Sequence, residues 1–321
     1  MGVHVARFEQ ADGIRWGVVE GDRLYSVPGT FATLAEFLSQ GKGSAFELDT
    51  AGEGIGLDSV RVLSPITAPC NVVCQGLNYN EHRVETGSAT SDTRAPFNLM
   101  FMKADSSLSG PYDDVVRPKG VRLLDYELEL GLVVGAPISK RTAMTDKNLA
   151  DYVAGIVISN DVSARDVQIP QGQWFKGKSY RTFCPVGPYL YLFDGDDIKM
   201  LSNIDIRLEV NGEVRQEANT GQLLYGPAET LAELSGLMDL HPGDLVQTGT
   251  PGGVAVKPPP AHIQRIARFV FGESKLMKIF VKKQLQNPNY LNDGDVLKLT
   301  MRTADGSIDL GVMETRVVAE R

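Results

Sequence analysis

The alternation of apolar and polar residues along the chain predicts more strands than helices. Near the beginning, three short alternating runs within residues 3–27 are separated by Asp-Gly and Gly-Asp dipeptides, which favour turns. A short helix is expected over residues 33–41, where Gly41 would end it. A proline-containing stretch follows that suits a crossing between domains, so we predict a small N-terminal β domain over residues 1–68.

Residues 69–321 are expected to form a larger, mixed β-rich α+β domain. Its predicted strands cover residues 72–74, 99–103, 127–134, 156–160, 189–193, 204–210, 213–218, 296–301 and 308–317. Asn211-Gly212 predicts a type I′ hairpin turn, because both residues tolerate a positive φ. Helices are fewer, and we expect them over residues 145–152 and 227–237.

Residues 255–292 differ from their surroundings and are interpreted as an insertion with one or two helices. The segment has three consecutive prolines near its start and seven basic residues against a single acid, Glu273. Lys278, Lys282 and Lys283 are interspersed with apolar residues, as in an amphipathic helix. A non-catalytic protein that docks a partner through this helix is therefore an alternative. A helix packed on its own protein is the simpler explanation.

The composition is that of an ordinary soluble globular protein, with 42% hydrophobic and 22% charged residues. A formal net charge of -8 argues against a general nucleic-acid binder, which would need a basic face. Three cysteines are too few for a disulfide framework, and no apolar run is long enough for a membrane span. We therefore expect a cytoplasmic protein without nucleic-acid or membrane partners.

Acidic residues at two strand positions are the candidate metal ligands. Glu127 and Glu129 alternate with leucines, so both carboxylates project from one face of a strand. A solvent-exposed strand face would explain these two residues equally well. Asp161, however, ends a second apolar strand, where functional sites are usually built. Three carboxylates without histidine or cysteine suit Mg²⁺ or Mn²⁺, with Ca²⁺ as a further candidate.

Basic and amide side chains follow the last of these acids. Arg165 and Gln168 recur at helical spacing, and Lys178 comes soon after them. Beside a metal ion, such groups bind a carboxylate or stabilise an oxyanion. Solvated surface charge is an equally good explanation for any one of them.

Two further candidates come from other parts of the chain. A helical turn would place His82 and Glu85 on one side, and a carboxylate that orients an imidazole makes a general base. A surface histidine near a surface acid is the simpler explanation. Thr250 lies in a glycine-rich loop after an apolar strand, where its hydroxyl could meet an anionic ligand. This loop lacks the ending of a phosphate-binding P-loop.

Several of these stretches occur together in a characteristic order. They are Gly76-Leu77-Asn78-Tyr79 with His82 and Glu85, then residues 101–108, 125–129, 159–166, 178–188 and 247–251. In this order they resemble the fumarylacetoacetate hydrolase family. The resemblance implies a mixed β-sandwich roll after a small N-terminal domain, and a homodimer. The segment at 255–292 would replace a short connection of that family.

The resemblance also implies roles for individual residues. It implies metal ligation by Glu127, Glu129 and Asp161. A water-activating pair is implied for His82 and Glu85. Contacts to the substrate or to its oxyanion are implied for Arg165, Gln168, Lys178 and Thr250, and Lys103 matches a lysine close to the site.

The function that follows is hydrolytic cleavage of a C–C bond in a β-diketo acid. The expected substrate is an acylpyruvate or fumarylpyruvate-like compound of aromatic catabolism, held on Mg²⁺ or Mn²⁺. Decarboxylation or isomerisation of a 2-oxo acid is the alternative, with a 2-hydroxyhepta-2,4-diene-1,7-dioate-like compound or oxaloacetate as substrate. Both reactions pass through an enolate that a divalent metal stabilises.

Overall fold

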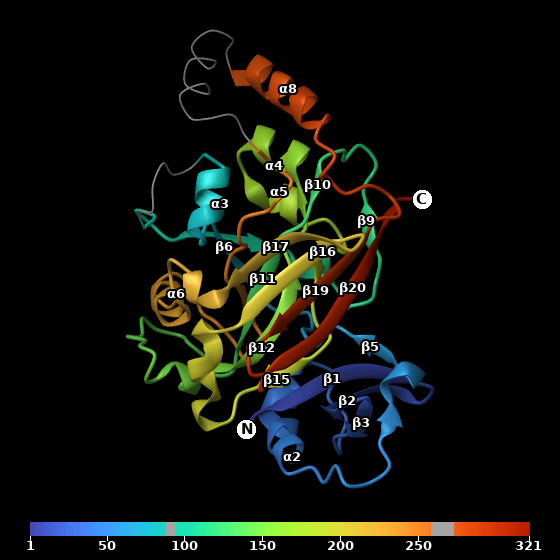
Figure 1. Ribbon diagram of the computed structural model, residues 1–321. Coiled ribbons are helices and arrows are strands. Elements are labelled where there is room, and N and C mark those ends of the chain that lie inside the picture. Colours follow the sequence, from blue (N-terminus) through green and yellow to red (C-terminus); the bar gives the residue numbers. More distant parts are fainter. Residues whose placement is uncertain (88–93, 258–272) are drawn as a thin grey trace.

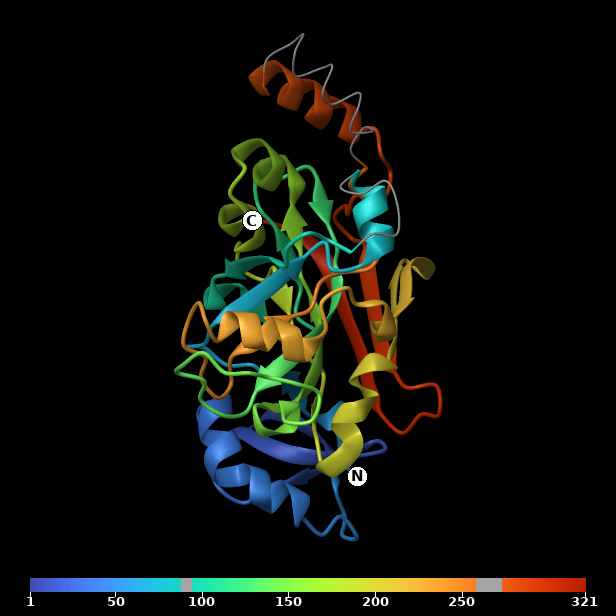
Figure 2. The same cartoon turned by 90° about the vertical axis from the view of Figure 1, so that its left-hand side faces the viewer.

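The computed structural model describes residues 1–87, 94–257 and 273–321, and Figures 1 and 2 show it from two sides. The N-terminal part lies at one end of the molecule and helix α8 (Glu273–Gln284) at the opposite end. Residues 258–272 of the segment expected to hold one or two helices lie outside the described residues. No helix in the described ranges is both long and apolar enough to cross a membrane.

The N-terminal strands form where the alternation predicts them. Strands β1 (Val3–Gln10), β2 (Gly13–Glu20) and β3 (Arg23–Ser26) form an antiparallel meander. Two short strands, β4 (Ile55–Gly56) and β5 (Arg61–Leu63), pair with β3 and β1. Strand β1 also pairs with a strand of the larger domain, so both parts share one sheet.

The predicted end of the first helix at Gly41 is wrong. A one-turn helix, α1 (Leu34–Glu36), continues through a π-helical turn (Phe37–Gly41) into α2 (Lys42–Phe46). Gly41 keeps a right-handed conformation. A Cβ atom at this position would lie 2.7 Å from the ring of Phe31, so packing rather than helix termination explains the glycine.

The large sheet has eleven strands within the described residues. Its strand order is β4-β3-β2-β1-β15-β12-β11-β18-β6-β7 with β5 beside β1. The strands from the larger domain are β6 (Val72–Gly76), β7 (Leu99–Lys103), β11 (Leu128–Val134), β12 (Val153–Asn160), β15 (Leu190–Leu192) and β18 (Leu245–Gln247). Every residue of β11 and β12 is buried, because both faces of the sheet are covered.

A second sheet of five strands packs across β11 and β12 (Figure 1). It contains β17 (Glu213–Asn219), β16 (Asp205–Val210), β19 (Val296–Arg302), β20 (Asp309–Ala319) and β9 (Val115–Arg117). Leu130, Ile156, Leu208 and Leu299 belong to the core between the two sheets. The predicted hairpin turn is confirmed, since Asn211 and Gly212 have φ values of 52° and 80°. The expected mixed, sheet-rich α+β class is likewise confirmed.

Two short strand pairs form separate two-stranded sheets. They are β10 (Leu124–Asp125) with β13 (Ser163–Ala164), and β8 (Leu108–Ser109) with β14 (Cys184–Pro185). Besides α8, the α-helices in the described part of the larger domain are α3 (Asn80–Glu85), α4 (Arg165–Gln171), α5 (Trp174–Lys178) and α6 (Pro227–Leu234). Short 3₁₀ helices cover Leu57–Ser59, Asp105–Ser107, Leu149–Asp151, Gly195–Ser202 and Thr220–Gln222.

The helix predicted over residues 145–152 is wrong except for its last turn. Only Leu149–Asp151 is helical there, as a 3₁₀ turn. The side chain of Asn148 accepts a hydrogen bond from the backbone N–H of Thr145 at 2.7 Å. Such local side-chain bonds offer the backbone an alternative to the helix.

Candidate metal centre and active site

The pairing of β11 with β12 brings the three predicted metal ligands together. Leu128 is opposite Asn160 in this antiparallel pair, so Glu127 and Asp161 lie at the same end of the two strands. The Asp161 N–H donates to the Glu127 carbonyl at 2.8 Å, and the Glu127 N–H donates to the Asn160 side chain at 3.0 Å. Glu129 lies two residues further along, on the same face of the strand.

The three carboxylates form one buried cluster. One oxygen from each of Glu127, Glu129 and Asp161 lies within 4.8 Å of the others. The exposed fractions of these residues are 4%, 1% and 0%, so a solvent-exposed strand face does not explain the glutamates. A buried set of carboxylate oxygens alone fits Mg²⁺ or Mn²⁺, which prefer oxygen ligands.

Three cations compensate part of the charge of this cluster. Lys103 and Lys178 each donate to Asp161 at 2.5 Å, and Lys178 also contacts Glu127. Arg165 contacts the other oxygen of Glu127. Glu129 instead accepts a hydrogen bond from the backbone N–H of Gly249 at 2.7 Å.

The pKa values of the two glutamates shift in opposite directions because their neighbours differ. Burial raises the pKa of the Glu129 carboxyl, and repulsion from Asp161 and Glu127 raises it further, to well above its ordinary value. Burial also works to raise the pKa of Glu127, but Arg165 and Lys178 outweigh it and hold this pKa below its ordinary value. Glu129 is thus the carboxylate whose charge a divalent cation would favour most.

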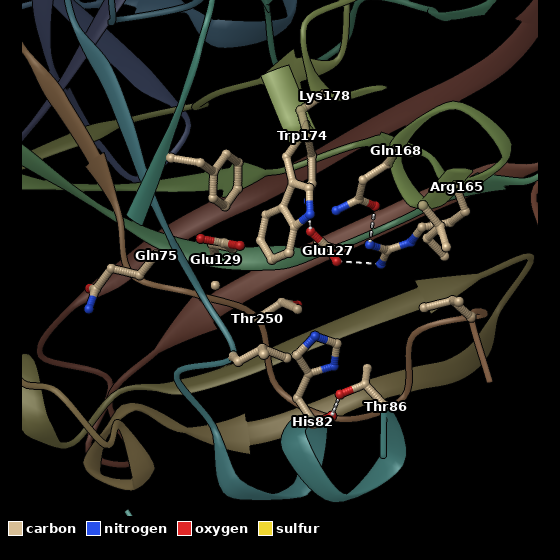
Figure 3. Close-up of a pocket in the computed structure, with 15 residues that line it drawn as sticks. Gln75, His82, Thr86, Glu127, Glu129, Arg165, Gln168, Trp174, Lys178 and Thr250 are labelled. Carbon is tan, nitrogen blue, oxygen red and sulfur yellow. Dashed lines mark hydrogen bonds and ion pairs between the residues drawn. The ribbon is translucent and has the colours of Figure 1, made fainter. Parts of the chain in front are cut away.

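Helices α4 and α5 supply the polar groups beside the cluster. Arg165 donates through Nε to Asp125 at 2.8 Å and through Nη1 to the side-chain oxygen of Gln168 at 2.9 Å. The amide nitrogen of Gln168 consequently points into the cavity (Figure 3). At Gly177, a Cβ atom would lie 2.7 Å from the Gln168 backbone, so a glycine allows the close approach of α5 that places Lys178 here.

His82 lies on α3, across the cavity from Glu127 and Glu129 (Figure 3). It is 5% exposed, so it is not a surface histidine. Its Nδ1 atom lies 4.0 Å from Glu85, which is too far for a hydrogen bond, and has no partner among the described residues. The Glu85 carboxylate accepts the Gly253 N–H at 2.9 Å instead. The predicted pair is therefore adjacent but not hydrogen-bonded.

These residues line a cavity of about 170 Å³. Seven of the ten predicted site residues reach its surface, namely His82, Glu127, Glu129, Arg165, Gln168, Lys178 and Thr250. Asp161 is buried in contact with the lining residue Lys178, and Lys103 is buried in contact with Asp161. Glu85 lies next to His82, 4.0 Å from its Nδ1 atom. The Thr250 hydroxyl accepts a hydrogen bond from Gln216 at 2.7 Å.

The cavity lining also has an apolar part, called the apolar wall below, which the sequence interpretation missed. It is formed by Leu77, Phe101, Ile169, Trp174 and Val256. The rings of Phe101 and Trp174 meet edge to face, with centroids 5.1 Å apart. No local pattern marks these residues, because they come from separate elements. Asp125, by contrast, could have been suspected, as a charged residue just before a buried strand.

Two family models match the chain. The model described as fumarylacetoacetate (FAA) hydrolase C-terminal matches residues 71–318. A second, described as Rv2993c-like, N-terminal, matches residues 3–65. The two matches lie on either side of residue 68, where the predicted domain boundary stays a prediction.

Individual relatives carry several activities. The mitochondrial oxaloacetate tautomerase Fahd2a of Rattus norvegicus is 36% identical over 263 residues, 79% of each chain. The structure of fumarylacetoacetate hydrolase from Exiguobacterium antarcticum is similar with a TM-score of 0.70 and 31% identity, covering 99% of this chain and 100% of that one. Maleylpyruvate hydrolase from Sphingobium sp. SYK-6, in complex with manganese (II) ion and pyruvate, has a TM-score of 0.71 and 25% identity at the same coverage.

Proposed function

Because the chain belongs to the fumarylacetoacetate hydrolase family, we propose that it is a metal-dependent enzyme that carries a small 2-oxo acid through its enolate. One observation carries the proposal. A buried cluster of three carboxylates, Glu127, Glu129 and Asp161, faces a histidine across a cavity of about 170 Å³. Mg²⁺ or Mn²⁺ held by these carboxylates would polarise the 2-oxo group of the substrate.

The reaction that these residues support most directly is keto–enol isomerisation. His82 removes a proton from the carbon next to the 2-oxo group and returns it to the oxygen, or the reverse. Lys178 and the amide nitrogen of Gln168 donate to the oxygen on which negative charge develops. A single base suffices for this transfer, and the Nδ1 atom of His82 has no hydrogen-bond partner among the described residues. The relatives named as oxaloacetate tautomerases make oxaloacetate the first substrate to test.

Hydrolytic C–C cleavage of an acylpyruvate is the second candidate. The proximity of Glu85 to His82, 4.0 Å between side-chain atoms, supports it. If the carboxylate exchanged its bond to Gly253 for one to His82, the pair would activate a water molecule that attacks the distal carbonyl. The relatives named as fumarylacetoacetate and maleylpyruvate hydrolases agree with this candidate.

A substrate panel separates the two reactions. The purified protein is assayed with oxaloacetate and with a series of acylpyruvates, in Mg²⁺ or Mn²⁺, before and after treatment with a chelator. Faster equilibration of the keto and enol forms without new products supports isomerisation, whereas release of pyruvate and a second acid supports hydrolysis. Activity that survives complete chelation would contradict the metal-dependent proposal.

The homodimer and the location also belong to the proposal. We expect a homodimer, and sedimentation of the purified protein tests it. The cytoplasm remains the proposed location. The rat relative is named as mitochondrial, so fractionation of cells that express the tagged protein is the appropriate test.

A further inference from the structure

The end of helix α8 is tied to a segment that borders the active site. Gln284, the last residue of α8, is 4% exposed. Its side-chain nitrogen donates to the Lys257 carbonyl at 2.8 Å, and its oxygen accepts the Lys257 N–H at 3.3 Å and the Tyr290 hydroxyl at 2.8 Å. Asn287 adds a bond to the Ala255 carbonyl. Gln284 and Asn287 thus fix residues 255–257 from one side.

The same segment holds a buried carboxylate from its other side. The N–H groups of Ala255 and Val256 donate to the two oxygens of Asp125, at 2.8 Å and 3.1 Å. Asp125 is fully buried, and Val256 also lines the cavity. The position of Asp125 therefore depends on the position of this backbone.

Asp125 in turn holds Arg165. The Nε atom of Arg165 donates to Asp125, while its two terminal nitrogens reach Glu127 and the oxygen of Gln168. Arg165 thereby orients one proposed metal ligand and one proposed oxyanion donor at once. A continuous series of buried polar contacts connects Gln284 to the carboxylate cluster.

We propose that Gln284 is a positioning residue of the active site, acting through the 255–257 backbone, Asp125 and Arg165. This inference rests on the proposed function. It gives the C-terminal part of the 255–292 segment a role: α8 supports helix α4 and the metal cluster rather than docking a partner. Outer partners that orient metal ligands change metal affinity or activity about 10- to 100-fold when they are lost. Several contacts separate Gln284 from the metal ligands, so we expect its loss to reduce metal affinity by about tenfold, the lower end of this range.

The main variant is Gln284→Leu, which keeps the approximate volume of the side chain and removes its amide. Tyr290→Phe is a milder second variant, since it deletes one hydroxyl donor to Gln284. It keeps the proposal testable if Gln284→Leu does not fold. Gln286→Ala is the matched control, because Gln286 is an exposed glutamine two residues further along the chain. All proteins are full length, and thermal melting is recorded for each.

Two readouts apply to each variant. Mn²⁺ binding is measured by titration calorimetry, and amide hydrogen exchange is followed in peptides covering residues 161–168. Gln284→Leu should weaken Mn²⁺ binding about tenfold and speed exchange at the beginning of α4. Tyr290→Phe should shift both in the same direction by less, and Gln286→Ala should shift neither.

A double-mutant cycle tests whether Gln284 acts on the carboxylate cluster through Asp125. If Gln284 acts through Asp125, Gln284→Leu should add less than about twofold to the loss of Mn²⁺ affinity in an Asp125→Asn background. Arg165→Lys is the substitute background if Asp125→Asn does not fold. Full additivity would overturn the inference, and so would Mn²⁺ affinity and exchange in Gln284→Leu that match the wild type. If the wild type itself binds no Mn²⁺, the proposed function fails, and hydrogen exchange alone then decides whether Gln284 positions α4.

Discussion

The two walls of the cavity differ in how their residues are held. On one wall, every charged side chain contacts another charged or polar group, as Lys178 does with Glu127 and Asp161. On the apolar wall, the rings of Phe101 and Trp174 pack edge to face, and Trp174 is partly exposed. The Lys178 ammonium also lies 5.1 Å from the centre of the Phe101 ring. The charged wall is therefore a network in which one change alters several neighbours, whereas the apolar wall is held mainly by packing and meets the network through the contact of Lys178 with Phe101.

This difference indicates which wall controls the reaction and which wall controls the choice of substrate. Buried charges are costly unless paired, so the charged wall tolerates few arrangements of its groups. Apolar contacts are non-directional, and the free energy that they contribute depends mainly on the volume that the side chains fill. We expect substitutions on the charged wall to remove catalysis and those on the apolar wall to change the choice of substrate.

The largest effect is expected from Glu129→Gln. Without a cation the raised pKa of Glu129 favours the neutral carboxyl, and glutamine resembles this neutral form. Melting without metal should therefore not fall, and it should rise at a pH above the ordinary glutamate pKa, because glutamine cannot ionise in the unfolded state. Mn²⁺ binding should be lost, and turnover should fall about a thousandfold, as expected when catalysis depends on the metal. Calorimetry, melting and the oxo-acid assay measure these outcomes. Glu81→Gln, an exposed glutamate on α3, is the control.

Retention of full Mn²⁺ affinity by Glu129→Gln would contradict the three-carboxylate site. A large loss of stability without metal would contradict the protonation of Glu129 instead. The two results distinguish an error in the ligand set from an error in its electrostatics.

The next largest effect is expected from His82→Gln, which removes the proposed base from the opposite side of the cavity. Turnover should fall about a hundredfold, the usual lower range for loss of a general base, with Mn²⁺ affinity unchanged. His241→Gln is the matched control, because His241 is exposed. Wild-type turnover in His82→Gln would move the proton transfer to another group.

Structural features that depend on a local pattern of residues could be predicted from the sequence. Alternation located β1, β2 and β3, and Asn211-Gly212 located a hairpin. Two glutamates spaced two residues apart at the beginning of β11, and an aspartate directly after β12, pointed to one carboxylate cluster, because strand periodicity fixes the direction of side chains.

Other features depend on contacts between distant segments and could not be predicted in this way. Gly41 allows close packing against Phe31, so it does not end the helix. Glu85 bonds to the Gly253 backbone, which no helical spacing reveals. Phe101 and Trp174 form one wall although they lie on different elements. In each case tertiary packing overrides the local signal.

A smaller effect is expected from pH, again on the charged wall. Because the pKa of Glu129 is raised, Mn²⁺ must displace a proton from this carboxyl. The apparent affinity should increase as the pH rises toward that raised pKa, by up to about tenfold per pH unit for one proton. Calorimetry at several pH values measures this slope. A slope of zero or of the opposite sign would contradict the protonated state.

The same shift has a consequence for the metal-free protein. Between the ordinary glutamate pKa of 4.5 and the raised value, the folded state binds more protons at Glu129 than the unfolded state does. The contribution of Glu129 to stability therefore declines as the pH rises through this window. Melting of the wild type should show this decline more steeply than melting of Glu129→Gln.

The smallest effect is expected from Trp174→Leu, on the apolar wall. Loss of the indole enlarges the cavity beside Phe101 and leaves the carboxylate cluster untouched. The KM for the smallest 2-oxo acid should rise about fivefold, and longer acyl groups should gain in kcat/KM, since pocket contacts of this kind discriminate weakly. Mn²⁺ affinity should stay unchanged. Phe175→Leu is the matched control, because Phe175 is the next residue on α5 and is 56% exposed. If Trp174→Leu instead weakened Mn²⁺ binding, the two walls would be coupled, and the separation of catalysis from selectivity would be wrong.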